Sequence, residues 1–163
     1  MSDRDGRIRL TILGGYLGSG KTTWLRHQLH EGQFKDALVI VNEAAETPID
    51  DALLGASNRL EVLAGGCVCC AARQDLIDLL RRISDERSRA STGAERLSHI
   101  VLETSGLADP GALVEAIRAD PALVYHILVG EVIVAIDALH GLSQIQSEPL
   151  SRQQIEVADR FVV

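Results

Sequence analysis

A glycine-rich segment near the N-terminus has residue types suited to binding phosphate. Residues 15–22 read GYLGSGKT and fit the pattern G-x-x-x-x-G-K-[ST], between a predicted strand and a predicted helix. Gly15, Gly18 and Gly20 let backbone N–H groups converge on phosphate oxygens without a Cβ clash. Lys21 reaches the β- and γ-phosphates, and the Thr22 hydroxyl can ligate Mg²⁺. We predict a phosphate-binding loop; the alternative is a glycine-rich turn that happens to precede a helix.

Three cysteines lie within four residues, Cys67, Cys69 and Cys70. Thiolates this close can face one soft ion, and Zn²⁺ takes cysteine sulfur in tetrahedral sites. The helix expected to begin near Ala72 would lower the thiol pKa values and favour the ligating form. Three sulfurs leave one coordination position open, as in sites that transfer an ion. Two alternatives remain: a redox pair, since Cys67 and Cys70 make C-x-x-C, and simple packing.

Two further groups of acidic residues could serve a phosphate site. Glu103 ends a predicted strand, where P-loop folds place a Mg²⁺ carboxylate, and Gly106 three residues later can offer its N–H to a γ-phosphate. Glu43, Asp50 and Asp51 fall in a predicted loop over residues 42–58, where a carboxylate could orient water. A solvated loop acid is the more frequent explanation for these three.

The elements that must position these groups alternate along the chain. Apolar runs predict strands over residues 7–13, 37–41, 61–64, 99–102, 132–136 and 161–163. Helical spacing predicts helices over residues 21–29, 72–89, 113–117 and 153–158, with a short one near 51–54. This order predicts an α/β fold, a mostly parallel sheet flanked by helices with right-handed crossovers.

Composition narrows the class of protein. A length of 163 residues corresponds to roughly one domain. The net charge of −7 argues against a nucleic-acid partner, and 46% apolar residues exclude a disordered chain. No apolar run reaches the ~18 residues of a membrane span, and the charged N-terminus does not fit a secretion signal. The odd, crowded cysteines fit a reducing compartment, so we expect a cytoplasmic protein without a membrane partner.

Six segments along the chain form a recognisable set: residues 14–23 (GGYLGSGKTT), 41–43 (VNE), 49–51 (IDD), 66–70 (GCVCC), 103–110 (ETSGLADP) and 135–138 (AIDA). They occur in the order seen in CobW-like metallochaperone GTPases, and the chain resembles that family along nearly all its length. The resemblance implies a P-loop NTPase fold with a SIMIBI-type G domain, related to the nickel-insertion GTPases for urease and hydrogenase. It also implies GTP hydrolysis coupled to handling of Zn²⁺ or Co²⁺ for a client metalloenzyme, and a link to cobalamin biosynthesis.

The resemblance also implies roles for individual residues. The phosphates would be held by Gly15, Gly18, Ser19, Gly20, Lys21, Thr22 and Thr23. Thr22 and Glu103 would serve Mg²⁺, and Cys67, Cys69 and Cys70 would bind the transition metal. Glu43 or Asp50 would position water while Lys21 and Mg²⁺ stabilise charge on the transferring phosphoryl group.

Two departures from the family pattern affect the expectations. The family's Asn-Glu-Phe-Gly reads Asn42-Glu43-Ala44-Ala45 here, so the family's switch geometry is not expected to carry over to that loop, although Glu43 remains. The family's guanine-reading Asn-Lys-x-Asp would follow the last predicted strand, where the sequence stops at Val163. We therefore expect residues 1–163 to form one nucleotide-binding domain that lacks this segment and a C-terminal domain, and that separates GTP from ATP poorly. Two rival functions are a non-catalytic, nucleotide-gated zinc-binding module and a P-loop ATPase or kinase with a redox C-x-x-C.

Overall fold

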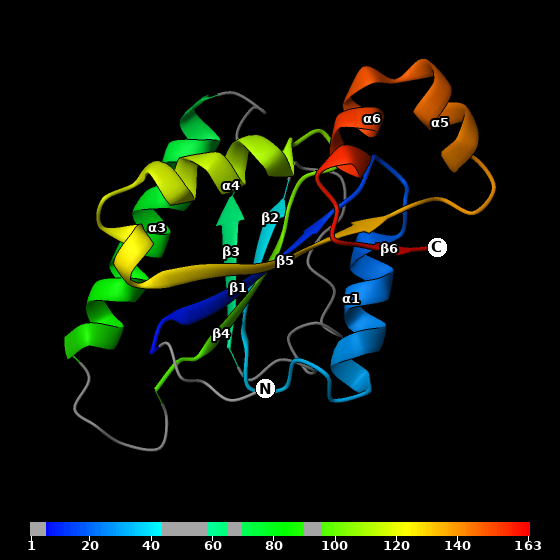
Figure 1. The fold of residues 1–163 in the computed structure, drawn as a ribbon. Coiled ribbons are helices and arrows are strands. Elements are labelled where there is room, and N and C mark those ends of the chain that lie inside the picture. The colour runs from blue at the N-terminus through cyan, green and yellow to red at the C-terminus, as the bar shows by residue number, and fades with distance from the viewer. Residues whose placement is uncertain (1–5, 44–58, 65–69, 90–95) are drawn as a thin grey trace.

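The computed structural model describes residues 6–43, 59–64, 70–89 and 96–163, and these form an α/β fold (Figure 1). The strands are β1 (Ile8–Gly14), β2 (Leu38–Glu43), β3 (Leu60–Ala64), β4 (His99–Glu103), β5 (Ile127–Ala135) and β6 (Arg160–Val162). The helices are α1 (Lys21–His30), α3 (Cys70–Arg89), α4 (Pro110–Ala119), α5 (Gly141–Ser147) and α6 (Pro149–Glu156), with a 3₁₀ turn at Leu123–Tyr125. The strands make one sheet in the order β3-β2-β4-β1-β5-β6, and each neighbouring pair is parallel. The predicted fold class is confirmed.

Helices cover both faces of this sheet (Figure 1). On one face, α3 and α4 pack against apolar side chains of the central strands, among them Leu10 and Ile12 of β1. On the other face, α1 packs Leu25 and Leu29 against residues that include Leu13 of β1. Because both faces are buried, the central strands read as nearly continuous apolar runs, which is what made them visible in the sequence.

The strand order places distant segments side by side at the carboxyl edge of the sheet. β4 lies between β1 and β2, so Glu103 at its end pairs with Leu13 on one side and Val41 on the other. Residues that follow β1, β2 and β4 therefore emerge at the same edge. In open α/β sheets this edge is where ligands bind.

Several predicted element boundaries were wrong. β5 begins at Ile127, earlier than predicted. The prediction missed its first part because Gly130 and Glu131 interrupt the apolar pattern, and the register with β1 shifts at this point. α4 begins at Pro110, since the Asp109 side chain accepts a hydrogen bond from the N–H of Gly111 and proline suits the first turn. α5 was not predicted, because it has few buried residues and so no apolar pattern.

The predicted loop over residues 42–58 was wrong at its start. Asn42 and Glu43 continue β2, because they pair in register with Leu63 and Ala64 of β3. α3 begins at Cys70 rather than near Ala72. The short helix predicted near residues 51–54 lies outside the described residues.

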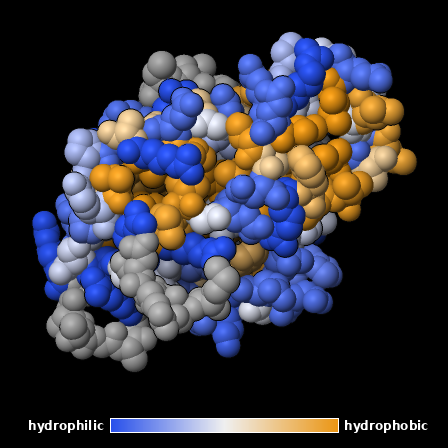
Figure 2. All heavy atoms as spheres, in the orientation of Figure 1, coloured by the Kyte–Doolittle hydropathy of each residue, from blue (hydrophilic) through white to orange (hydrophobic). Residues whose placement is uncertain are grey.

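On the face shown in Figure 2, apolar residues gather over α5 and α6 and also across the middle of the molecule, with polar residues around them. The most exposed large apolar side chains near α5 are Leu139, 87% exposed, and Leu142, 70% exposed. In the described part of the chain, no helix is both long and apolar enough to cross a membrane.

Candidate functional site

The segment between β1 and α1 has a backbone that depends on its glycines. Gly15, Gly18 and Gly20 have φ values of 139°, 75° and 84°, a region that favours glycine. A Cβ on Gly15 would also lie 2.5 Å from the carbonyl oxygen of Ala135 and 2.6 Å from Ser19 Oγ. The residue types that the motif demanded are therefore required by the observed conformation.

This backbone gives a direct test of the loop geometry. We expect Gly15→Ala to lower the free energy of unfolding by about 3 kcal/mol, because it combines backbone strain with a clash against the β5 backbone. Gly18→Ala is the matched control: a Cβ there meets no atom within 4 Å, so backbone strain alone should cost about 1 kcal/mol. Urea unfolding of both variants measures the difference, and equal losses would contradict the observed loop.

The first turn of α1 is well suited to an anion. Gly20 at its N-cap is left-handed, and no side chain caps the helix. The first turn contains no acidic residue. Helix N-terminal N–H groups lack partners within the helix and carry partial positive charge, so they favour phosphate.

Lys21 points back over the loop. Its Nζ donates hydrogen bonds to the carbonyl oxygens of Gly15 (2.8 Å) and Tyr16 (3.2 Å). The side chain is buried, and this burial lowers the pKa of Lys21, while the nearby Glu103 carboxylate opposes the shift. The loop therefore encloses an ammonium group whose desolvation is only partly offset by Glu103. A bound phosphate would offset it further.

Thr22 and Glu103 meet although 81 residues separate them. Thr22 Oγ1 donates to Glu103 Oε1 at 2.5 Å, while Glu103 Oε2 is buried and has no hydrogen-bond partner. Burial raises the pKa of Glu103, and the Thr22 hydrogen bond and Lys21 partly oppose this. A hydroxyl and a carboxylate with an unpartnered oxygen are the hard oxygen ligands that Mg²⁺ prefers, so this pair fits the ion.

Gly106 lies directly against the glycine-rich loop. A Cβ on Gly106 would come within 2.8 Å of the backbone nitrogen of Leu17. The preceding Thr104 is fixed to β1, because its N–H and Oγ1 both donate to the carbonyl oxygen of Leu13 at 2.9 and 3.2 Å. Two segments far apart in sequence thus form one surface.

Ser19 and Thr23 were both predicted to contact phosphate. Ser19 Oγ is buried and has no hydrogen-bond partner, whereas Thr23 is exposed on α1.

Other predicted site residues are only partly described. Asp50, Asp51, Cys67 and Cys69 lie outside the described residues. Only the backbone is described for Glu43, the last residue of β2 rather than a loop residue, and for Cys70, the first residue of α3. Among described residues, no three His, Cys, Asp or Glu side chains cluster as metal ligands would. Sequence reasoning missed Gln154, a buried α6 residue that contacts the Gly106 segment; no spacing signal pointed to it.

A strand, a glycine-rich loop, an uncapped helix and a carboxylate ending the neighbouring strand together define a P-loop nucleotide-binding domain. A family model described as the CobW/HypB/UreG nucleotide-binding domain matches residues 9–163, and the chain belongs to this family. The resemblance inferred from the sequence motifs is confirmed.

Similar proteins include two curated zinc chaperones. The chain is 34% identical over 157 residues to zinc chaperone YjiA of Escherichia coli, covering 96% of this chain and 48% of that protein. It is 34% identical over 142 residues to zinc chaperone CobW of Pseudomonas aeruginosa, covering 81% of this chain and 36% of that protein. The chain therefore spans about half or less of the length of these relatives.

The fold is also similar to solved structures. The crystal structure of the Zn(II)-bound YjiA GTPase from E. coli superposes with a TM-score of 0.63 at 28% identity, over 95% of this chain and 48% of that one. A Zn(II)-bound triple mutant of YjiA, with one glutamate and two cysteines replaced by alanine, gives a TM-score of 0.64 at 27% identity.

Proposed function

We propose that this chain is the nucleotide-binding part of a zinc-handling GTPase, which couples the nucleotide state to a metal ion held by cysteines and delivered to a client protein. The observation that carries the proposal is the joint placement of Lys21, Thr22 and Glu103 at the uncapped end of α1. The family and the names of its relatives support GTP as the nucleotide and zinc as the metal.

Each residue of the loop has a defined part in the proposed hydrolysis. Backbone N–H groups of residues 15–20 and of the α1 N-terminus bind the phosphates. On binding, the Lys21 ammonium exchanges the carbonyl oxygens of Gly15 and Tyr16 for phosphate oxygens and stabilises charge on the transferring group. Thr22 and Glu103 would hold Mg²⁺, which would supply positive charge to the transferring phosphoryl group. Glu43 or Asp50 would orient the attacking water.

Cys67, Cys69 and Cys70 would hold the metal cargo. β3 ends at Ala64 and α3 begins at Cys70, so the motif joins a strand end to a helix N-terminus. Helix N-termini carry partial positive charge, which suits an anionic ligand such as a thiolate. Zn²⁺ and Co²⁺ both accept such ligands.

Phosphate release with GTP and with ATP, each with and without Zn²⁺, tests this function against its rivals. A GTPase predicts phosphate release that requires Mg²⁺ and responds to Zn²⁺. Zinc binding and nucleotide binding without phosphate release would support the non-catalytic module instead. Hydrolysis of ATP alone, unaffected by Zn²⁺, would support the ATPase with a redox pair.

Glu103→Gln should lower kcat about 100-fold and remove the acid limb of the pH–rate profile. The carboxylate form is needed for Mg²⁺, and burial raises the pKa of Glu103. The metal-free site therefore loses its carboxylate at a higher pH than an ordinary glutamate would, so at limiting Mg²⁺ the activity of the unmodified protein should fall at a higher pH as pH decreases. Steady-state rates between about pH 4 and 8 measure this effect, because a glutamate with a raised pKa titrates in roughly this range.

Variants of Thr22 provide the matched control for the Mg²⁺ pair. Thr22→Ser keeps the hydroxyl and should retain most activity, whereas the isosteric Thr22→Val should raise the Mg²⁺ concentration needed for half-maximal rate. Equal behaviour of the serine and valine variants would show that the hydroxyl does not serve the ion.

A further inference from the structure

Gln154 on α6 is a buried polar side chain that the proposed function does not use. It is 1% exposed, and its Nε2 donates to the carbonyl oxygens of Gly106 (3.2 Å) and Ala108 (2.7 Å). Two acceptors fix the orientation of the amide, because a flipped amide would set its oxygen against both carbonyls. The Oε1 atom is buried and has no hydrogen-bond partner. Such an atom costs stability, so packing alone does not explain a glutamine here.

The two hydrogen bonds fall in the middle of a segment whose ends are fixed separately. At its start, Thr104 is bonded to Leu13 of β1. At its end, the Asp109 side chain caps α4 by accepting from the N–H of Gly111. Gln154 holds the intervening residues from another helix. Its loss would leave both ends attached and free only the part that contains Gly106.

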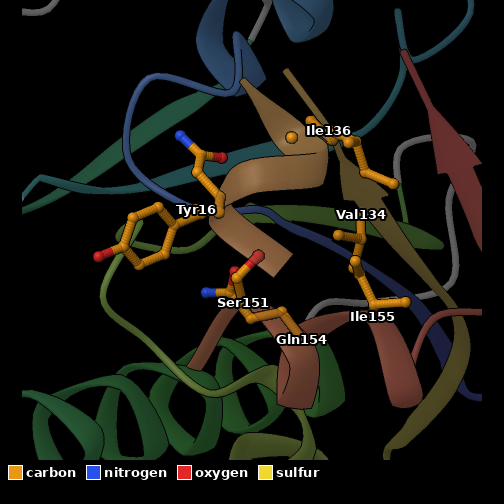
Figure 3. Close-up of a pocket in the computed structure, with 9 residues that line it drawn as sticks. Tyr16, Val134, Ile136, Ser151, Gln154 and Ile155 are labelled. Carbon is orange, nitrogen blue, oxygen red and sulfur yellow. The ribbon is translucent and has the colours of Figure 1, made fainter. Parts of the chain in front are cut away.

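On its other side the same segment touches the glycine-rich loop. Gly106 abuts Leu17, where a Cβ would come within 2.8 Å of the backbone nitrogen. Tyr16 of that loop and Ser151 and Gln154 of α6 line one cavity (Figure 3). Gln154 therefore bridges α6 to the Gly106 segment at the point where this segment meets the glycine-rich loop.

We propose that Gln154 is a positioning residue, which holds Gly106 against the glycine-rich loop so that the site binds a nucleoside triphosphate more tightly than a diphosphate. Gly106 is the expected γ-phosphate contact, so this inference rests on the proposed function. A diphosphate makes no such contact, and its affinity depends on the glycine-rich loop and α1. Through its hydrogen bonds to the Gly106 segment, the side-chain amide of Gln154 thus makes the position of α6 matter for binding of the third phosphate.

The test compares dissociation constants for GDP and for the non-hydrolysable analogue GMPPNP, both with Mg²⁺, by calorimetry. Gln154→Met keeps the length of the side chain but removes both donors and the unpaired oxygen. Gln154→Leu is the second variant, because its apolar side chain is also unable to donate to the two carbonyl oxygens. For each we expect the preference for GMPPNP over GDP to fall about tenfold, with GDP affinity changed less than about threefold.

Gln144→Met is the matched control. Gln144 of α5 lines the same cavity but makes no side-chain hydrogen bond to the described Gly106 segment, so its preference should equal that of the unmodified protein. Lower stability would reduce the amount of folded protein, not the ratio of two affinities, which separates positioning from a purely structural role.

The outcomes distinguish this inference from the proposed function. Gln154 variants that keep or increase the GMPPNP preference would overturn the inference and leave the proposed function standing. An unmodified protein that binds both nucleotides equally would do the same. If the unmodified protein binds neither nucleotide, the proposed function fails and the inference fails with it.

Discussion

Lys21→Ala should reduce phosphate release at least about 1,000-fold while leaving the fold intact. The side chain contributes an ammonium group to the site, and charge stabilisation of the transferring phosphoryl group by one positioned donor or cation is typically worth about 10²- to 10⁵-fold. The fold should survive because burial of this ammonium is unfavourable, as its lowered pKa indicates, so removal of the charge relieves a cost. Circular dichroism and steady-state phosphate release measure the two effects.

Lys35→Ala is the control for the lysine prediction. Lys35 is the only other lysine of the chain and is exposed between α1 and β2, so its loss should change neither rate nor fold. A Lys21→Ala protein that hydrolysed GTP at the rate of the unmodified protein would contradict the P-loop role.

The second large effect concerns the cysteines. Reduced protein should bind one Co²⁺ or Zn²⁺ through Cys67, Cys69 and Cys70, and Cys69→Ser should weaken that affinity about 100-fold or more. Structural zinc sites provide roughly 10–16 kcal/mol from about four ligands, so one thiolate contributes about 3 kcal/mol. A hydroxyl is a much poorer ligand for a soft metal. Affinity should fall as pH decreases, since each thiol must lose its proton to ligate.

Co²⁺ titration followed by absorption tests this assignment against the alternatives. Three sulfur ligands predict an intense sulfur-to-metal charge-transfer band and tetrahedral visible absorption. A redox pair predicts instead a dithiol that oxidises reversibly without metal. The spectrum is needed because zinc is present in a YjiA crystal structure whose protein lacks two cysteines and a glutamate. If no thiolate band forms, and Cys69→Ser leaves Co²⁺ affinity unchanged, the cysteine site is wrong.

The sequence determined the parts of the site that are local. The order of glycines, Lys21 and Thr22 was sufficient to predict a phosphate-binding loop, because positive φ values and a helix start depend on residues close together in the chain. Strands buried on both faces were also predicted, because their burial requires a run of neighbouring apolar residues. Where local signals were weak, prediction failed: β5 was shortened because Gly130 and Glu131 break its pattern, and α5 was missed.

Pairing between strands also lies beyond local pattern. Asn42 and Glu43 are polar and were predicted as loop, yet they continue β2 because β3 supplies hydrogen-bonding partners for their backbone. Nothing in the six residues of β2 indicates whether a neighbouring strand extends as far.

Only the tertiary structure decided which distant residues meet. The alternation of strands and helices allows several strand orders, and the observed order, with β4 between β1 and β2, is what brings Glu103 to Thr22. The contact of Gly106 with Leu17 and the hydrogen bonds of Gln154 follow from packing of helices on that sheet. A sequence pattern records the burial of a strand or a helix face, but the partner of a buried polar atom depends on which elements pack together, and that is set by the whole fold.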